Sequence, residues 1–191
     1  DEGLQDIFDD TMKIGKADME RALLPRACDM LRYLKKAEKR VRAYGDPIYA
    51  RVYLLEFAKA LAETEACLNY KAPAKEPLSQ ASALNPSLMQ RFYEYPMNNA
   101  LDQDAVLALI KEGYEYIDSH LDVICGRLLK FLSSDGEPKR ASVIREYFRA
   151  RVMHITEYLY EKGIIEKISV PIRITPNGRQ VVEEIAYIYE G

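Results

Sequence analysis

Basic side chains gather in residues 137–179, where they could bind the phosphate groups of a nucleic acid. This stretch holds nine Lys and Arg residues against five Glu residues, whereas the whole chain has a net charge of −3. Lys and Arg hold backbone phosphates, and Arg at the start of a recognition helix also reads base edges in the major groove. The net charge by itself argues against a general nucleic-acid binder, but the distribution of charge makes this stretch a candidate nucleic-acid contact, with double-stranded DNA as the expected partner.

The predicted recognition helix covers Arg149–Lys162 and ends at Gly163, which adopts the left-handed conformation without strain from a Cβ atom. At 100° per residue, the stripe that must face the core contains Val152, Ile155 and Leu159. The opposite side, which would face DNA, contains Arg151, His154 and Tyr158.

Phosphate contacts are also expected from the helix before it, from the hairpin and from a closing helix. The full set of candidate DNA-binding residues is Lys139, Arg140, Arg145, Arg149, Arg151, His154, Tyr158, Arg173 and Arg179. The alternative is that these are ordinary exposed side chains, some of them paired with Glu146, Glu157 and Glu161. Because the last two glutamates would repel phosphate, only the first half of the recognition helix could approach DNA closely.

The elements around this helix are predicted from local signals. The turn cluster Ser133–Pro138 precedes a helix at about 138–147. Ile164–Thr175 is rich in β-branched residues, which favours short strands confined to this stretch. Thr175 is a suitable N-cap and Pro176 a suitable first helical residue, so a closing helix is expected after them.

These segments resemble a known family. The run Tyr-Leu-Tyr-Glu-Lys-Gly-Ile-Ile-Glu-Lys at 158–167, followed by Ile-Thr-Pro-Asn-Gly-Arg-Gln-Val-Val-Glu-Glu-Ile at 174–185, is similar to the second half of winged-helix regulators of the MarR and PadR type. The resemblance covers about residues 120–190. It implies a helix before Gly163 that enters the major groove and a hairpin that contacts the DNA backbone or minor groove. Glu146-Tyr147-Phe148 lacks the usual Gly, and the short hairpin predicts a small wing.

Other chemistry finds little support in the sequence. There is no glycine-rich phosphate loop or nucleophile elbow, and no carboxylate is expected in an apolar run that would raise its pKa. Cys28, Cys67 and Cys125 are isolated, as expected of buried thiols in a reducing compartment, and the only histidines, His120 and His154, make a zinc site improbable. We therefore expect no enzyme activity, no metal and no cofactor.

The rest of the chain is predicted to be helical. Apolar spacing indicates a helix from Pro25 to Tyr44 and another at about 47–69, joined at Gly45-Asp46-Pro47 into an antiparallel hairpin. A Pro-rich connection at 73–101 contains a short helix at about 86–94. Asp102 then caps a long helix that extends to about Ser133, in which Gly113 leaves room for a break.

The predicted fold is therefore mainly α, with a helical hairpin or bundle at 1–72, the connection at 73–101, and a long helix leading into a winged helix at 102–191. A hydrophobic fraction of 48% is enough for a packed core. The sequence contains no apolar run of about eighteen residues that would predict a membrane span. A cytoplasmic location is therefore expected.

Two functions remain open from the sequence. The first is a DNA-binding transcription regulator that acts as a homodimer through helices 26–69 or 102–132. The second is a winged helix that binds a protein partner in a larger assembly, such as a chromosome-condensation or segregation complex. Fold alone does not decide between them.

Overall fold

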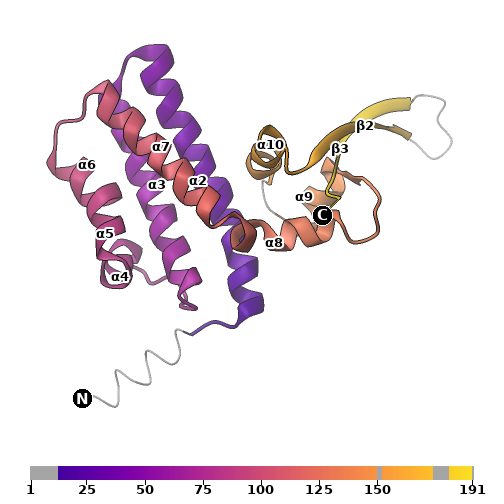
Figure 1. Ribbon diagram of the computed structural model, residues 1–191, viewed down its shortest axis with the longest axis horizontal. Helices are drawn as coiled ribbons and strands as arrows, with labels where there is room; N and C mark the ends of the chain where they lie inside the picture. The colour runs from indigo at the N-terminus through magenta and orange to yellow at the C-terminus, as the bar shows by residue number, and fades with distance from the viewer. Residues whose placement is uncertain (1–12, 150–151, 174–180, 191) are drawn as a thin grey trace. The chain divides into compact units, whose positions relative to one another are not determined.

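The computed structural model describes residues 13–149, 152–173 and 181–190 (Figure 1). The chain divides into two compact units, a helical unit at Asp1–Ile124 and a C-terminal unit at Cys125–Gly191. Helices build the first unit, and the second carries a three-stranded antiparallel sheet. The predicted fold class, mainly α with a small β region at the C-terminal side, is confirmed. None of the helices in the described part of the chain has the length and apolar character of a membrane span.

The helical hairpin predicted at the start of the chain is present. Helix α2 (Lys16–Tyr44) ends at Gly45, whose φ of 60° is left-handed, and Asp46 caps α3 (Pro47–Leu68) by accepting the Tyr49 N–H at 2.9 Å. The prediction that a helix begins at Pro25 is wrong, because α2 passes through this residue. Pro25 is exposed, while Leu23 and Leu24 beside it are buried in the core, and their packing offsets the hydrogen bond that proline cannot make.

Helix α7 (Gln103–Ser119) packs against α2 and α3. Gly113 permits this close approach, because a Cβ atom there would lie 2.9 Å from Leu34 Cδ2 and 3.1 Å from Phe57 Cζ. The long helix expected from Asp102 to Ser133 is instead two helices, and the break falls at His120 rather than at Gly113. At the break, His120 Nδ1 lies 2.9 Å from the Tyr116 carbonyl oxygen, the acceptor that the His120 N–H would use in a continuous helix.

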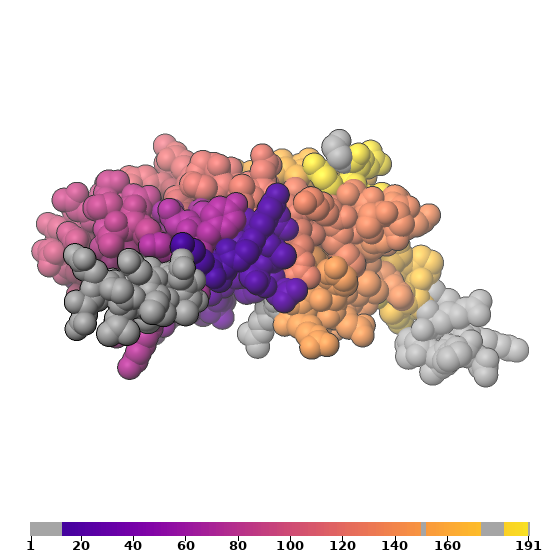
Figure 2. Space-filling view, turned by 90° about the horizontal axis from the view of Figure 1, so that it is seen from below, coloured from indigo at the N-terminus to yellow at the C-terminus, as the bar shows by residue number. Residues whose placement is uncertain are grey.

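The Pro-rich connection contains more structure than the single short helix predicted for it. It forms α4 (Pro77–Leu84), α5 (Pro86–Met89), a π-helical turn (Gln90–Glu94) and α6 (Tyr95–Asn98). These segments lie along the side of α3 that faces away from α2 (Figure 1). In Figure 2 the first turns of α2, in indigo, lie beside the magenta segment that follows α3, where the Ile14 N–H donates to the Tyr70 carbonyl at 2.9 Å.

The C-terminal unit combines short helices with a small antiparallel sheet. Part of α8 (Leu121–Leu132) is followed by β1 (Lys139–Arg140), α9 (Ala141–Phe148), α10 (Met153–Glu161), β2 (Glu166–Arg173) and β3 (Val181–Ile188). The strand order is β1-β3-β2, and all pairs are antiparallel. The register pairs Glu166 with Ile188 and Lys139 with Tyr187, so β3 is the central strand.

Two predictions for this unit are wrong. Strands are not confined to Ile164–Thr175, and the segment Val181–Ile188 is strand β3 rather than part of a closing helix. The cap signal at Thr175 and Pro176 lies outside the described residues. β-branched side chains in β3 favour a strand, and pairing along the whole of β2 satisfies its backbone, so the wing is longer than predicted.

Candidate functional site

Three of the predicted DNA-binding residues are exposed on or beside α9. Arg140 is the N-cap of α9, Arg145 lies in its last turn, and Arg149 is its C-cap with a left-handed φ of 49°. The prediction that Arg149 begins the recognition helix is wrong, since α10 begins at Met153. Arg151 and Arg179 lie outside the described residues. Arg173 is the last residue of β2, and its side chain is not among those described.

Lys139 and Tyr158 are not available to DNA as predicted. The Lys139 side chain is only 12% exposed, pairs with Asp135 and lies over the Phe131 ring. Tyr158 is 5% exposed, because the buried stripe of α10 includes it together with Ile155 and Leu159. The exposed side of α10 is therefore not the side that the sequence predicts. His154 is half-buried.

In the described part of the chain, the exposed residues of α10 and of the β2–β3 hairpin lack the positive charge expected of a DNA-binding surface. Met153 is 52% exposed and Tyr160 is 45% exposed, and Glu161 is exposed beside them. Residues 152–173 and 181–190 contain six Glu against three Lys and Arg. Phosphate groups would be repelled there, so α9 is the better placed of the two helices for contact with a polyanion.

The carboxylate of Glu157 joins α10 to both long strands. It accepts hydrogen bonds from Tyr187 Oη at 2.8 Å and from Lys167 Nζ at 2.8 and 3.1 Å. Tyr187 is 1% exposed, and burial raises the pKa of its hydroxyl. The hydrogen bond to Glu157 raises the pKa of Lys167. Each polar group in this cluster has a partner within it, which indicates a structural role.

A second carboxylate, Glu65, lies in the helical unit beside a pocket of about 530 Å³. The pocket is lined by residues from α3, α5, the π-helical turn, α7 and the break before α8, namely Glu65, Leu68, Asn69, Asn85, Ser87, Leu88, Arg91, Phe92, Tyr116 and His120. Its volume lies in the range of small-molecule sites, roughly 300–1,000 Å³. Apolar and hydrogen-bonding side chains are mixed along its walls.

Glu65 is 6% exposed and makes two side-chain hydrogen bonds. Tyr116 Oη donates to Glu65 Oε1 at 2.5 Å, and Asn85 Nδ2 donates to Glu65 Oε2 at 3.2 Å. Burial, followed by the hydrogen bond to Glu65, raises the pKa of Tyr116 far above its ordinary value, so the hydroxyl keeps its proton. Both donors are therefore neutral groups.

Local structure fixes these two donors. Asn85 is the N-cap of α5, where its Oδ1 accepts the Leu88 N–H at 3.3 Å, and this bond turns its amide nitrogen toward Glu65. Tyr116 lies in the last turn of α7, and its ring packs on the His120 ring with centroids 4.4 Å apart. The pocket wall is therefore held by the helix break at His120 and by the cap of α5.

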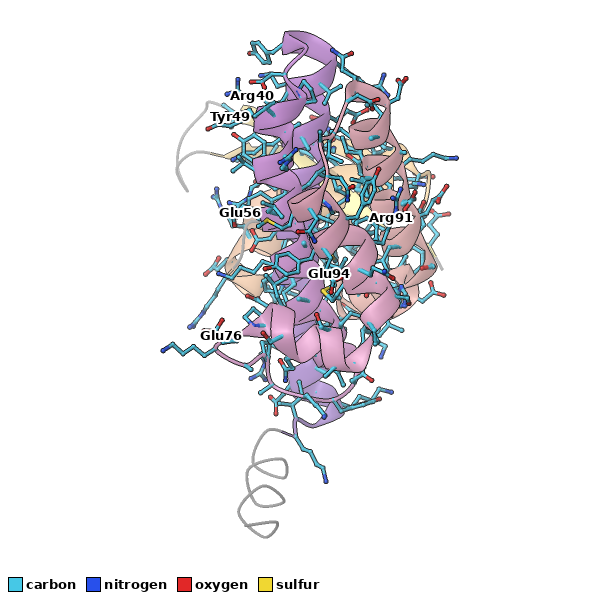
Figure 3. All side chains as sticks on the ribbon, turned by 90° about the vertical axis from the view of Figure 1, so that its left-hand side faces the viewer. Arg40, Tyr49, Glu56, Glu76, Arg91 and Glu94 are labelled. Carbon is cyan, nitrogen blue, oxygen red and sulfur yellow. The ribbon has the colours of Figure 1, made fainter. Side chains whose placement is uncertain are left out.

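Arg91 and His120 form the polar rim of the pocket. Arg91 extends from the π-helical turn toward α7 (Figure 3), where its Nε and Nη2 each donate to Glu112 at 2.6 Å, which raises the pKa of the guanidinium. Its charge is thus matched by Glu112. His120 Nδ1 lies 2.9 Å from a carbonyl oxygen, so this nitrogen carries hydrogen and Nε2 is left as an acceptor in the neutral ring.

No family model matches this chain, and no curated protein matches it. A solved structure does resemble it, that of a nucleotidyltransferase-like protein from Exiguobacterium sibiricum, with 12% sequence identity and a TM-score of 0.73. The likeness covers 93% of this chain and 61% of that chain, so this chain spans about three fifths of its neighbour's length. Because 93% of the chain includes residues of both units, the shared fold extends over both.

Glu65 is a buried acid that sequence reasoning missed. The signal was present in the sequence, since Glu65 follows Leu61 by four residues and Ala58 by seven on the buried stripe of α3. Among the nearest neighbours of Glu65 along α3, Thr64, Ala66 and Cys67 are also buried. An acid at a helical position reserved for the core indicates either a buried partner or a ligand.

Proposed function

We propose that this chain is a ligand-binding protein whose Glu65 pocket binds a small molecule that carries a protonated amino group. The observation that carries this proposal is the buried carboxylate of Glu65, which is held by two neutral donors at the wall of a pocket of about 530 Å³. An ammonium group of the ligand would hydrogen-bond to the free lone pairs of this carboxylate.

The charge of Glu65 supports a cationic ligand. Other partly buried acids of the helical unit pair with cations, as Glu112 does with Arg91 and Glu63 with Arg26 at 3.3 Å. Among the described residues, no Lys or Arg pairs with Glu65. A buried charge without a counter-charge is costly, and binding an ammonium ion would relieve that cost.

The other walls define the rest of the ligand. Asn69, Ser87 and the Nε2 atom of His120 offer donors and acceptors for hydroxyl groups, while Leu68, Leu88 and Phe92 offer apolar surface. A compact amine that also carries hydroxyl groups, such as an amino sugar, matches this mixture better than an apolar amine or a purely charged polyamine.

The name of the structural neighbour suggests a context for such a ligand. In a nucleotidyl transfer, a molecule with a free hydroxyl or amino group accepts the nucleotidyl group, and a polar amine fits that role. We therefore place the Glu65 pocket on the acceptor side of a nucleotidyl transfer.

Thermal stability in the presence of ligands tests the proposal. Glucosamine, spermidine and ethanolamine are compared with glucose, which has the shape of glucosamine without its charge. We expect glucosamine to raise Tm and glucose to leave it unchanged, because a ligand that binds the folded state stabilises it. Glu65→Gln should abolish the effect, while Glu56→Gln, an exposed position on the same helix, should keep it. Equal stabilisation by glucose, or none by any amine, would reject the proposal.

DNA binding by the C-terminal unit is the second candidate function, and it is favoured by the exposure of Arg140, Arg145 and Arg149 around α9. In this form of the proposal α9, rather than α10, approaches the duplex, and the exposed Met153 and Tyr160 of α10 contact a protein partner. Transcription regulation and pairing of two copies through α2–α3 or α7–α8 remain predictions that accompany it.

Fluorescence anisotropy with a labelled 20-base-pair duplex tests this second candidate. Replacing the three arginines around α9 by Gln should weaken binding to all duplexes alike and lower the salt slope by roughly two to three units. The matched control is the triple variant Lys59→Gln/Lys75→Gln/Lys111→Gln, which removes the same charge from exposed positions of the helical unit. Equal losses in both variants would leave only a general charge effect and reject the candidate.

A further inference from the structure

A cluster of cations and tyrosines lies where α2 turns into α3. We call it the tip patch, and it consists of Lys36, Lys39, Arg40, Tyr44, Tyr49 and Tyr53. It is distinct from the Glu65 pocket, because it surrounds the first turns of α3 whereas Glu65 lies in the last turn. Binding at the tip patch would therefore be independent of the function proposed for that pocket.

Stacking orients the cations of the tip patch. The Arg40 guanidinium lies 4.3 Å from the centroid of the Tyr49 ring and 5.0 Å from that of Tyr44. Arg40 and Tyr49 are adjacent in Figure 3. One turn earlier on α2, Lys36 Nζ lies 5.3 Å from the Tyr53 ring centroid. A guanidinium that stacks through its face keeps the N–H groups at its edge directed outward, where they can donate to an oxyanion.

The positive charge of the tip patch is not neutralised within the described part of the chain. Neighbouring cations of α2 do have acidic partners, as Arg32 pairs with Asp29 at 2.9 Å and Arg42 with Glu38 at 2.7 Å. Within the described residues, Lys36 and Arg40 contact aromatic rings, and no carboxylate pairs with Lys36, Lys39 or Arg40. Three cations thus remain available on the surface of a chain whose net charge is −3.

The tyrosines add exposed aromatic surface to this charge. Tyr44 is 61% exposed and Tyr49 is 46% exposed, and a hollow of about 210 Å³ lies between Lys36, Lys39, Arg40, Tyr44 and Tyr53. Cations that hold a phosphate backbone beside aromatic rings that stack on bases are the two parts of a surface for single-stranded nucleic acid.

We propose that the tip patch binds single-stranded nucleic acid. Lys36, Lys39 and Arg40 contact successive phosphates, and the rings of Tyr44 and Tyr49 stack on unpaired bases. Duplex DNA fits less well, since its bases are already stacked and cannot cover the rings. The exposed side chains Ile48 and Val52 lie on the same part of α3, at 77% and 49% exposure, and an anionic membrane surface could use them together with the cations. Membrane binding is therefore an outcome that the test must separate.

Anisotropy of fluorescein-labelled dT20 and rU20 with the full chain, at 50 and 150 mM NaCl, tests the proposal. The triple variant Lys36→Gln/Lys39→Gln/Arg40→Gln should weaken binding more than tenfold and lower the salt slope by about two units, as three lost phosphate contacts require. Tyr44→Ala/Tyr49→Ala should weaken binding about tenfold or more without changing the salt slope, because stacking is not ionic. Circular dichroism confirms that each variant is folded.

The control Lys59→Gln/Lys75→Gln/Lys111→Gln removes the same charge elsewhere on the helical unit and should change affinity less than twofold. An equal loss in this control would overturn the proposal, as would the absence of wild-type binding at 50 μM protein and 50 mM NaCl. Loss only in the variant of the three arginines around α9 would also overturn it. Sedimentation with vesicles of anionic phospholipid provides the last comparison. Binding to vesicles that depends on Ile48 and Val52, with no competition by dT20, would reject single-stranded nucleic acid in favour of a membrane surface.

Discussion

Glu65 in the helical unit and Glu157 in the C-terminal unit share one kind of hydrogen-bond donor and differ in their other partners. Each accepts a hydrogen bond from a tyrosine hydroxyl, Tyr116 at 2.5 Å and Tyr187 at 2.8 Å. Glu157 also binds Lys167 at 2.8 Å, whereas the second donor to Glu65 is the neutral amide of Asn85. Glu65 lies beside a pocket, and Glu157 lies between α10 and the sheet.

Under the proposed function, this difference separates an acid that stabilises the fold from one that is kept for a ligand. The negative charge of Glu157 is matched within the protein, so its interactions contribute to the stability of the C-terminal unit. Among the described residues, no positive charge pairs with Glu65. Burying its charge therefore destabilises the folded state, and a bound cation would offset that cost. Sites of this kind exchange stability for function.

The largest stability effect is expected from Glu157→Ala. This change leaves the buried hydroxyl of Tyr187 without its acceptor and Lys167 without its carboxylate. We expect a loss of about 2 kcal/mol in the free energy of unfolding of the C-terminal unit, measured by urea denaturation. Glu146→Ala, at an exposed position of α9, is the control and should change stability by less than about 0.5 kcal/mol. Similar losses in the free energy of unfolding for both variants would contradict the structural role assigned to Glu157.

A smaller, pH-dependent effect is expected at Glu184, which caps a helix from another element. Glu184 Oε1 accepts the Ser142 N–H at 2.7 Å, in the first turn of α9. The hydrogen bonds from Ser142 lower the pKa of Glu184. A lowered pKa in the folded state means that this carboxylate contributes stability above its unfolded pKa, roughly 4.3, and that the contribution is lost as the pH falls through the folded pKa.

Glu184→Gln should therefore cost about 0.5–1 kcal/mol at pH 7, since a neutral side chain interacts less with the start of the helix. The difference from wild type should decrease as the pH falls below roughly 4.3. Denaturant titrations at pH 7, 5, 4 and 3 measure it. A difference that grows toward low pH would contradict the assigned role of Glu184.

The smallest change in stability is expected from Glu65→Gln, in contrast to the large loss expected from Glu157→Ala. Glu65→Gln keeps the shape of the side chain, and its amide can accept from Asn85 while donating to the Tyr116 oxygen. We expect the free energy of unfolding to stay equal or to rise by up to about 1 kcal/mol, because a buried charge without a counter-charge is removed. Chemical denaturation beside Glu56→Gln provides the measurement. A loss of more than about 2 kcal/mol would show that Glu65 stabilises the fold, as Glu157 does.

Much of the fold could be predicted from short-range signals. Gly45, Asp46 and Pro47 end one helix and start the next within three residues, and the α2–α3 hairpin follows from them. Strand β3 was missed because the Thr175 and Pro176 cap signal is local, whereas the reason for a strand is pairing with β2. The sequence places Tyr158 on the exposed side because the buried stripe expected from Val152, Ile155 and Leu159 is too narrow, whereas the buried face of α10 also includes Thr156 and Tyr158.

The candidate site was less accessible to sequence reasoning, because distant residues build it. Tyr116 is 51 residues from Glu65 and Asn85 is 20 residues away, and no spacing rule joins them. The charge of the tip patch can be read from the sequence, since residues 21–42 hold eight Lys and Arg against two acids. Its aromatic part cannot, because Tyr49 and Tyr53 join it from α3, on the other side of the turn. Local patterns indicate which helical face is buried, while the partners of a buried acid depend on tertiary packing.

The most direct test of the Glu65 pocket is the side-chain carboxyl resonance of Glu65 in a carbon-13 NMR titration with glucosamine at pH 7. The resonance is assigned by its absence in Glu65→Gln, and Glu56 serves as the internal reference. We expect the Glu65 signal to shift to saturation with one dissociation constant while the Glu56 signal stays in place, and glucose to have no effect. A Glu65 signal that does not move when glucosamine raises Tm, or that moves equally with glucose, would contradict the assignment of Glu65 as the ammonium-binding group.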